Sequence, residues 1–436
     1  MENTSSIKHE LKYTYYLSKV LCLAPYSFFS DPIACGKCIN TNLWSNVTGL
    51  IWTLFMSVVM VMGLIGGIFR YQNTGHDNVG ITVNTIFCFP MNFINALLSF
   101  VVLFLKRYKF ADLIEKLSEI DDGVCQIKLC KSAKCQNYFL HFTLIVCLML
   151  AAFMCFDVVE AENRKYFIYC SLYRVAYFIS IVLIIQFCHI VMCTQQRLFI
   201  LRKQISSVSE NKIPVAVSST PKPILIEEIS KSELPSVMSV FSETVYLSYD
   251  SRMKCQSASN NLLLPTKLPD PHKIISYRQI YSNIYDAVQL INSIYGFLLL
   301  LLFTRAAAGL VTNIYHLASI TLGGEIVDQF ENWGAPAHIF SLACWISIFL
   351  STVIAMTVTC QVVILESKKI GDIIQKLLLQ QHVRCEAVEQ LKLFSEQVTK
   401  NKIEFSALCL FKVDMSLLCT ILASVTSYII VLVQFK

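Results

Sequence analysis

The stretch from Met415 to Phe435 reads Met-Ser-Leu-Leu-Cys-Thr-Ile-Leu-Ala-Ser-Val-Thr-Ser-Tyr-Ile-Ile-Val-Leu-Val-Gln-Phe and contains no charged residue. A helix rises about 1.5 Å per residue, so this run can cross a bilayer core of about 30 Å. Small and polar side chains recur along it at steps of three and four and therefore share one face. That face suits close packing against neighbouring helices, the commoner use, or contact with water in a pore. Its members are Ser416, Thr420, Ala423, Ser427, Ile430 or Val431, and Gln434.

The composition places the whole chain among membrane proteins. Of its 436 residues, 55% are hydrophobic and only 15% are charged. Apolar runs of about 20 residues or more predict an all-α protein with seven membrane-spanning helices. We expect Pro90 to kink the second of them. The predicted spans are 48–69, 80–105, 138–159, 167–193, 295–320, 337–365 and 415–435.

The distribution of Lys and Arg predicts the orientation in the membrane, because basic residues concentrate in cytosolic loops. The segments before the first span and at 106–137, 194–294 and 366–411 together hold 29 of the 36 basic residues. The opposite side of the membrane holds four. We therefore predict a cytosolic N-terminus and an extracellular C-terminus, which is the reverse of a G-protein-coupled receptor.

The spans divide the chain into six parts. Residues 384–405 include an apolar face that predicts an amphipathic helix, lying on the membrane or packing against partner helices. The parts are a cytosolic arm at 1–47 with an interfacial segment, helices one to four at 48–193, cytosolic extensions around a flexible insert (about 206–272) at 194–294, helices five and six at 295–365, a cytosolic helical base at 366–414, and a pore-lining helix at 415–436.

Two stretches carry a resemblance to a known family. Ser427-Tyr428, five apolar residues and Gln434-Phe435 resemble the C-terminal signature of insect gustatory receptors, Thr-Tyr-five hydrophobics-Gln-Phe. Ser427 replaces the usual threonine and keeps its hydroxyl. The stretch at 16–26, Tyr-Leu-Ser-Lys-Val-Leu-Cys-Leu-Ala-Pro-Tyr, is similar to the N-terminal region of the fructose-sensing lineage of that family.

The resemblance implies a homotetrameric, ligand-gated cation channel whose four last helices line the pore. It places the receptor in the plasma membrane of sensory dendrites, alone or as a heteromer with other gustatory receptors. Gln434 and Phe435 would then lie at the gate, with Ser427, Ile430 and Val431 along the pore. Asp414, the acid beside the last span, would attract cations to the inner mouth or cap the helix.

The predicted outer halves of the spans contain residues that suit a small polyhydroxylated ligand, which needs aromatic faces and a few fixed polar groups. Interfacial aromatic belts are the alternative explanation for the tyrosines. Leu342 stands where the fructose-sensing lineage has a glutamine, which favours another sugar or a polyol. Asp157 matches an aspartate of that lineage. The candidate ligand residues are Trp345, Asp157, Tyr177, Tyr173, Thr321, Ser341, His338 and Arg305.

Arg305 falls near the middle of the fifth predicted span. A charged side chain at that depth is costly unless it faces the bundle and has a partner. We therefore expect Arg305 to lie at the floor of the ligand site, to couple that site to the gate, or to form a structural pair. The sequence names no partner for it.

The chain contains no motif that indicates catalysis. Walker-type glycine loops, His-Glu-x-x-His and Cys/His sets with metal spacing are absent from the sequence. We therefore expect no enzymatic activity, no metal, no cofactor and no nucleic-acid partner. Other ligands, such as an inositol or a bitter compound, and other classes, a sugar transporter or a metabotropic seven-helix receptor, remain alternatives.

Overall fold

The computed structural model describes residues 6–21, 23–24, 43–73, 89–125, 164–210, 271–323, 334–379 and 385–434 of the chain. Apart from one small hairpin, the elements among these residues are helices, as the composition predicts. Residues up to Ser207 and from Pro269 belong to one compact unit, and the contacts described below lie within it.

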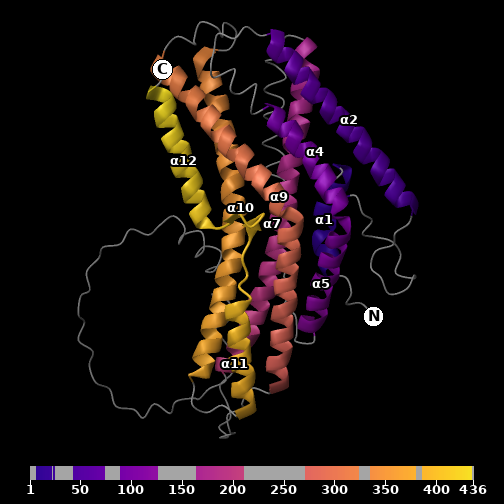
Figure 1. Ribbon diagram of the computed structural model, residues 1–436, viewed down its shortest axis with the longest axis vertical. Helices are drawn as coiled ribbons and strands as arrows, with labels where there is room; N and C mark the ends of the chain where they lie inside the picture. Colours follow the sequence, from indigo (N-terminus) through magenta and orange to yellow (C-terminus); the bar gives the residue numbers. More distant parts are fainter. Residues whose placement is uncertain are drawn as a thin grey trace, which may run out of the picture. The chain divides into compact units, whose positions relative to one another are not determined.

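Six apolar helices coincide with six of the seven predicted spans (Figure 1). Within the described residues, four of them are long and apolar enough to cross a membrane, and α4 and α12 carry shorter apolar runs. The third predicted span, at 138–159, and the part of the second at 80–88 lie outside the described residues. The kink at Pro90 therefore stays a prediction. The six helices are α2 (Leu43–Asn73), α4 (Phe89–Leu105), α7 (Arg164–Glu210), α9 (Pro271–Gly323), α10 (Gly334–Leu378) and α12 (Met415–Gln434).

Three of these helices run well beyond the predicted spans. α7 has 47 residues, α9 has 53 and α10 has 45, so each extends past the membrane core as a continuous rod. α9 contacts α4, α5, α10, α11 and α12 (Figure 1). α7 reaches Glu210, which shortens the predicted insert, whose remainder lies outside the described residues. α9 is thus the element against which most of the described chain packs.

Two amphipathic segments pack against the chain's own helices. The N-terminal helix α1 (Ser6–Val20) contacts α5 (Arg107–Cys125). Thr14 Oγ1 also lies 2.6 Å from Nδ1 of His189 in α7. The helix predicted within 384–405 forms as α11 (Cys385–Lys400), and it contacts α9 and α10 through a buried apolar face. That face contains Ala387, Leu391 and Phe394.

A hairpin that the sequence did not predict joins the base to the last helix. Strand β1 (Ser406–Ala407) pairs antiparallel with β2 (Phe411–Lys412). Between them, Leu408 and Cys409 have positive φ angles of 52° and 60°. Such turns normally contain glycine or asparagine, because other side chains are strained in the left-handed region. The predicted helical base at 366–414 therefore also contains this short hairpin.

The hairpin is fixed to α9 by two residues. Asn292 donates from Nδ2 to the carbonyl oxygen of Glu404 over 2.8 Å, and its Oδ1 accepts from the backbone N–H of Ser406 over 3.2 Å. At Gly296, an added Cβ would lie only 3.1 Å from the backbone nitrogen of Leu408. Because the backbones approach so closely, the start of α12 is positioned directly by α9.

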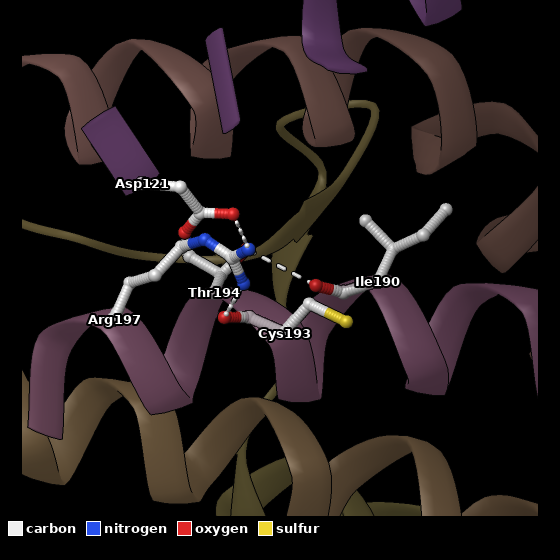
Figure 2. Close-up of polar contacts among 5 residues, drawn as sticks. All are labelled: Asp121, Ile190, Cys193, Thr194 and Arg197. Atoms are coloured by element: carbon white, nitrogen blue, oxygen red, sulfur yellow. Dashed lines mark hydrogen bonds and ion pairs between the residues drawn. The ribbon is translucent and has the colours of Figure 1, made fainter. Parts of the chain in front are cut away.

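Two buried ion pairs connect α7 with its neighbours. Arg197 Nη2 lies 2.7 Å from Oδ2 of Asp121 in α5, and Arg197 Nη1 donates to the carbonyl oxygen of Cys193 over 2.7 Å (Figure 2). Burial raises the pKa of Asp121, and the Arg197 guanidinium opposes that shift. On α10, the buried carboxylate of Glu366 lies 2.8 Å from Nε of Arg202.

We expect replacement of Asp121 by alanine to lower the free energy of unfolding by about 3 kcal/mol, because it leaves a buried guanidinium without its acid. The control is Lys116→Ala, which removes partly exposed pairs with Asp286 at 3.6 Å and Glu119 at 3.9 Å and should change stability by less than about 1 kcal/mol. Thermal midpoints of the detergent-solubilised protein provide the measurement. Equal midpoints for the two variants would contradict a stabilising role for the buried pair.

Candidate ligand site and pore helix

Arg305 lies inside the bundle and contacts three other helices. Its side chain is only 3% exposed. Nη1 donates to Oδ1 of Asn92 in α4 over 2.8 Å. Cζ lies 4.4 Å from the centre of the Tyr177 ring in α7 and 5.7 Å from that of Phe349 in α10. The guanidinium thus combines one hydrogen bond to a neutral amide with two cation–π contacts.

Aromatic rings from α7 and α10 surround this arginine. Tyr177 meets Trp345 edge-to-face, with ring centres 5.0 Å apart, and lies 5.9 Å from Phe349. Trp345 and Phe349 are themselves 6.0 Å apart. These spacings are those at which aromatic pairs attract one another. We call Asn92, Tyr177, Arg305, Trp345 and Phe349 the arginine cluster.

The structure brings some of the predicted ligand residues together. Tyr177, Arg305 and Trp345 belong to the arginine cluster. Tyr173 lies beside it, because its ring packs edge-to-face on Phe93 at 6.4 Å, and Phe93 follows Asn92 in α4. These residues come from helices that are far apart in the sequence, so their convergence is a property of the fold.

Four other predicted ligand residues are not joined to the cluster by contacts among the described residues. Thr321 is exposed near the end of α9, where its hydroxyl donates to the Leu317 carbonyl over 3.0 Å. Ser341 is half-buried in α10. His338 also belongs to α10, but its side chain lies outside the description, as does all of Asp157. A ligand role for these four stays a prediction.

Sequence reasoning did not single out Asn92 or Phe349. Asn92 is a polar residue inside an apolar run, two residues after Pro90, and such residues in membrane helices usually have a partner or a function. That signal could have identified it. Phe349 carries no signal, because it is one of 28 phenylalanines and its importance comes from the ring beside Arg305.

α12 has one packed face and one exposed face. It contacts α9 and α10, and its buried or half-buried positions include Leu418, Ile421, Val425 and Ile429. At 3.6 residues per turn, the small and polar positions fall about half a turn away from these. All of them are exposed in the single chain: Ser416, Thr420, Ala423, Ser427 and Gln434.

The predicted gate residues lie on or near this exposed face. Ile430 and Val431 are 54% and 47% exposed. The Ser427 hydroxyl donates to the Ala423 carbonyl over 2.9 Å, which satisfies it within its own helix. Gln434 is the last residue of α12, and Phe435 lies outside the described residues. The predicted roles of all these residues in a gate remain open to experiment.

Asp414 caps α12. Its Oδ1 accepts from the backbone N–H groups of Ser416 and Leu417 over 3.0 and 3.2 Å. An aspartate in this position satisfies free donors of the first turn and complements the helix dipole. Of the two roles considered for Asp414, the cap is therefore the one that the structure contains.

Gly309 in α9 allows the Phe349 ring to reach the cluster. A Cβ at Gly309 would lie 2.5 Å from Cζ of Phe349, which no real contact tolerates, whereas a Cβ at Gly371 would meet Val398 at an ordinary 3.5 Å. We expect Gly309→Ala to displace the ring and to lower stability by about 1–3 kcal/mol. Gly371→Ala is the matched control and should be neutral or stabilising, because alanine favours a helix. Thermal midpoints that fall equally in both variants would contradict the close contact.

Comparisons with known proteins agree with this architecture. The family described as 7tm Chemosensory receptor matches residues 11–436. Gustatory receptor 28b of Drosophila melanogaster is 27% identical over 184 residues, a match that spans 42% of this chain and 38% of that receptor. The insect olfactory receptor OR5 from Machilis hrabei superimposes with a TM-score of 0.61 at 11% identity, covering 100% of both chains.

A second structure of that olfactory receptor, in complex with eugenol, superimposes with the same TM-score of 0.61 at 10% identity and covers 98% of this chain and 99% of that one. At such low identity the likeness concerns the fold alone, that of an all-helical membrane receptor. The family match and the Drosophila relative confirm the resemblance to insect gustatory receptors. This chain belongs to the seven-transmembrane chemosensory receptor family.

Proposed function

We propose that this receptor is a cation channel of four identical chains, opened by a small polyhydroxylated molecule such as a sugar or a polyol. The observation that carries the proposal is the exposed small and polar face of α12, opposite the face that packs on α9 and α10. Four such helices around a common axis would line a path for water and ions.

In a membrane, the small and polar face of α12 has to contact lipid, another helix or water. Hydroxyl and amide groups gain nothing from contact with lipid chains, so membrane helices direct them toward other helices or toward water. Ser416, Thr420 and Ser427 are exposed in the isolated chain, whereas Leu418 and Val425 are buried. Neighbouring copies of α12 and the water between them would provide the missing surroundings.

The arginine cluster is the proposed ligand site. It offers aromatic faces for a carbon skeleton together with the polar groups of Asn92 and Arg305. The stretch at 16–26 that is similar to the fructose-sensing lineage favours a sugar-like ligand, and Leu342 favours one other than fructose. The solved olfactory receptor, which shares this fold, has been captured with eugenol, another small molecule.

Weak binding at each site would be enough to operate such a gate. If each of four sites binds the open state about tenfold more tightly, the four together contribute about 5.5 kcal/mol. That free energy moves a two-state equilibrium from about 1:99 to about 99:1. A receptor for abundant tastants in the plasma membrane of a sensory cell would therefore open firmly without high affinity at any one site.

Purified protein in a planar bilayer tests the function. We expect sugar- or polyol-evoked unitary currents carried by cations, from particles whose mass corresponds to four chains. Flux of labelled sugar without unitary currents would indicate a transporter instead. Currents that appear only when another gustatory receptor is present would indicate a heteromer. An inositol and a bitter compound belong in the same panel of ligands.

Cysteine accessibility tests the pore-lining face of α12. We expect a cysteine that replaces Ser427 to react with a small charged methanethiosulfonate added during activation, and the evoked current to fall by at least half. A cysteine that replaces Val425, on the packed face, should leave the current unchanged. The wild-type chain sets the baseline, because it already contains 18 cysteines. Equal modification at both positions would mean that α12 does not face the pore as proposed.

A further inference from the structure

Two buried polar atoms in the arginine cluster have no hydrogen-bond partner among the described residues. They are Nε of Arg305 and Oη of Tyr177. The Tyr177 side chain is only 1% exposed and that of Arg305 only 3%, so water in the bulk cannot serve as the partner. The Arg305 guanidinium is near enough to the Tyr177 hydroxyl for a charge interaction and a weak polar contact. Neither Nε of Arg305 nor Oη of Tyr177, however, has a partner in regular hydrogen-bond geometry among the described residues. A buried donor without a hydrogen bond lowers the stability of the folded state. Such donors are therefore rare in folded proteins unless they serve a function.

The positive charge of Arg305 also has different neighbours from those of Arg197 and Arg202 on α7. Arg197 lies 2.7 Å from the carboxylate of Asp121, and Arg202 lies 2.8 Å from that of Glu366. Arg305 instead contacts the neutral Asn92 amide and two aromatic faces, and within the described part of the chain it forms no ion pair. Guanidinium groups removed from water normally acquire an anionic partner.

We propose that the ligand of the arginine cluster carries a carboxylate, so that the receptor responds to sugar acids and polyol acids in preference to their neutral parents. This inference rests on the proposed function and specifies the chemical class of its ligand. The carboxylate accepts hydrogen bonds from Nε of Arg305 and from the Tyr177 hydroxyl, and it neutralises the guanidinium.

A carboxylate fits these donors better than a neutral oxygen does. Nε of arginine only donates, and a tyrosine hydroxyl can donate, so both groups need an acceptor. A carboxylate presents two acceptor oxygens in one plane, and its hydrogen bonds to a charged donor are shorter and stronger than those of a hydroxyl. A neutral sugar hydroxyl could accept from either donor or from both, but it would leave the charge of Arg305 without an anion. The ring of Trp345, edge-to-face with Tyr177, adds an aromatic surface against which a hydroxylated carbon chain could pack.

Matched pairs of agonists test the inference on the purified full-length protein in planar bilayers. Gluconate is compared with glucitol, and galacturonate with galactose, at one neutral pH and one ionic strength. We expect each acid to activate at a concentration at least about tenfold below that of its neutral partner, since a charge-assisted hydrogen bond is that much stronger. Neutral members that activate as well as the acids, or better, would overturn the inference and leave the channel proposal intact.

Removal of one hydroxyl provides the second arm. Tyr177→Phe keeps the ring, the cation–π contact and the edge-to-face pair, and removes only Oη. It should raise the half-activating concentration of the acids several-fold and change that of the neutral partners by less than about twofold. Tyr295→Phe is the matched control, because Tyr295 is another buried tyrosine of the bundle whose hydroxyl has no partner among the described residues, and it packs on Phe187. Equal effects of Tyr177→Phe on acids and neutrals would overturn the inference.

Ligand binding measured without currents separates the two proposals. An acid that raises the thermal midpoint of the wild-type protein more than its neutral partner does, with the difference lost in Tyr177→Phe, supports the carboxylate site whether or not a channel opens. Absence of currents with every ligand counts against the channel. Absence of any acid-specific shift in the midpoint counts against the carboxylate site.

Discussion

The placement of one guanidinium constrains how the apolar helices meet. An arginine near the middle of a membrane helix costs about 2.5–3.5 kcal/mol on insertion scales, so the surrounding helices have to offer it polar and aromatic partners. Arg305 obtains them from α4, α7 and α10 at once, through Asn92, Tyr177 and Phe349. Gly309, one turn further along α9, leaves room for the Phe349 ring. Four helices therefore meet at Arg305, because each of the other three supplies a partner for its charge.

The same helix carries the support of α12. Asn292 and Gly296 hold the hairpin that leads into α12, and Arg305 lies nine residues beyond Gly296, about 13 Å along the axis. A continuous helix transmits a tilt or a shift along its length, because its backbone hydrogen bonds resist bending. If the ligand binds at the proposed site, rearrangement around Arg305 would therefore act on the hairpin directly. Coupling of this kind requires only that α9 have two positions with different affinities for the ligand.

The sequence predicted features that repeat along a single helix. It did not predict features that depend on contacts between two helices. Apolar runs located the six described spans, and spacing alone indicated a small and polar face on α12, whose members are exposed in the single chain. The partner of Arg305 was different, because Asn92 is 213 residues away and no local pattern links them. The hairpin was missed for another reason: Leu408 and Cys409 adopt positive φ angles without the glycine or asparagine that announces such a turn. The contacts with Asn292 and Gly296 of α9 explain why the chain folds there.

The cap on α12 limits how the proposed pore could favour cations. Asp414 is the acid beside this helix in the sequence, and its Oδ1 is engaged by two backbone N–H groups of the first turn. The position of Asp414 is therefore explained by its role as a helix cap. That role does not require ion conduction. Beyond this cap α12 carries no charge, so the polar groups on its exposed face are neutral hydroxyls and an amide, beside apolar side chains such as Ile430 and Val431. A path lined in this way discriminates weakly among small cations, which is what a receptor needs if the signal is depolarisation and the identity of the ion is unimportant.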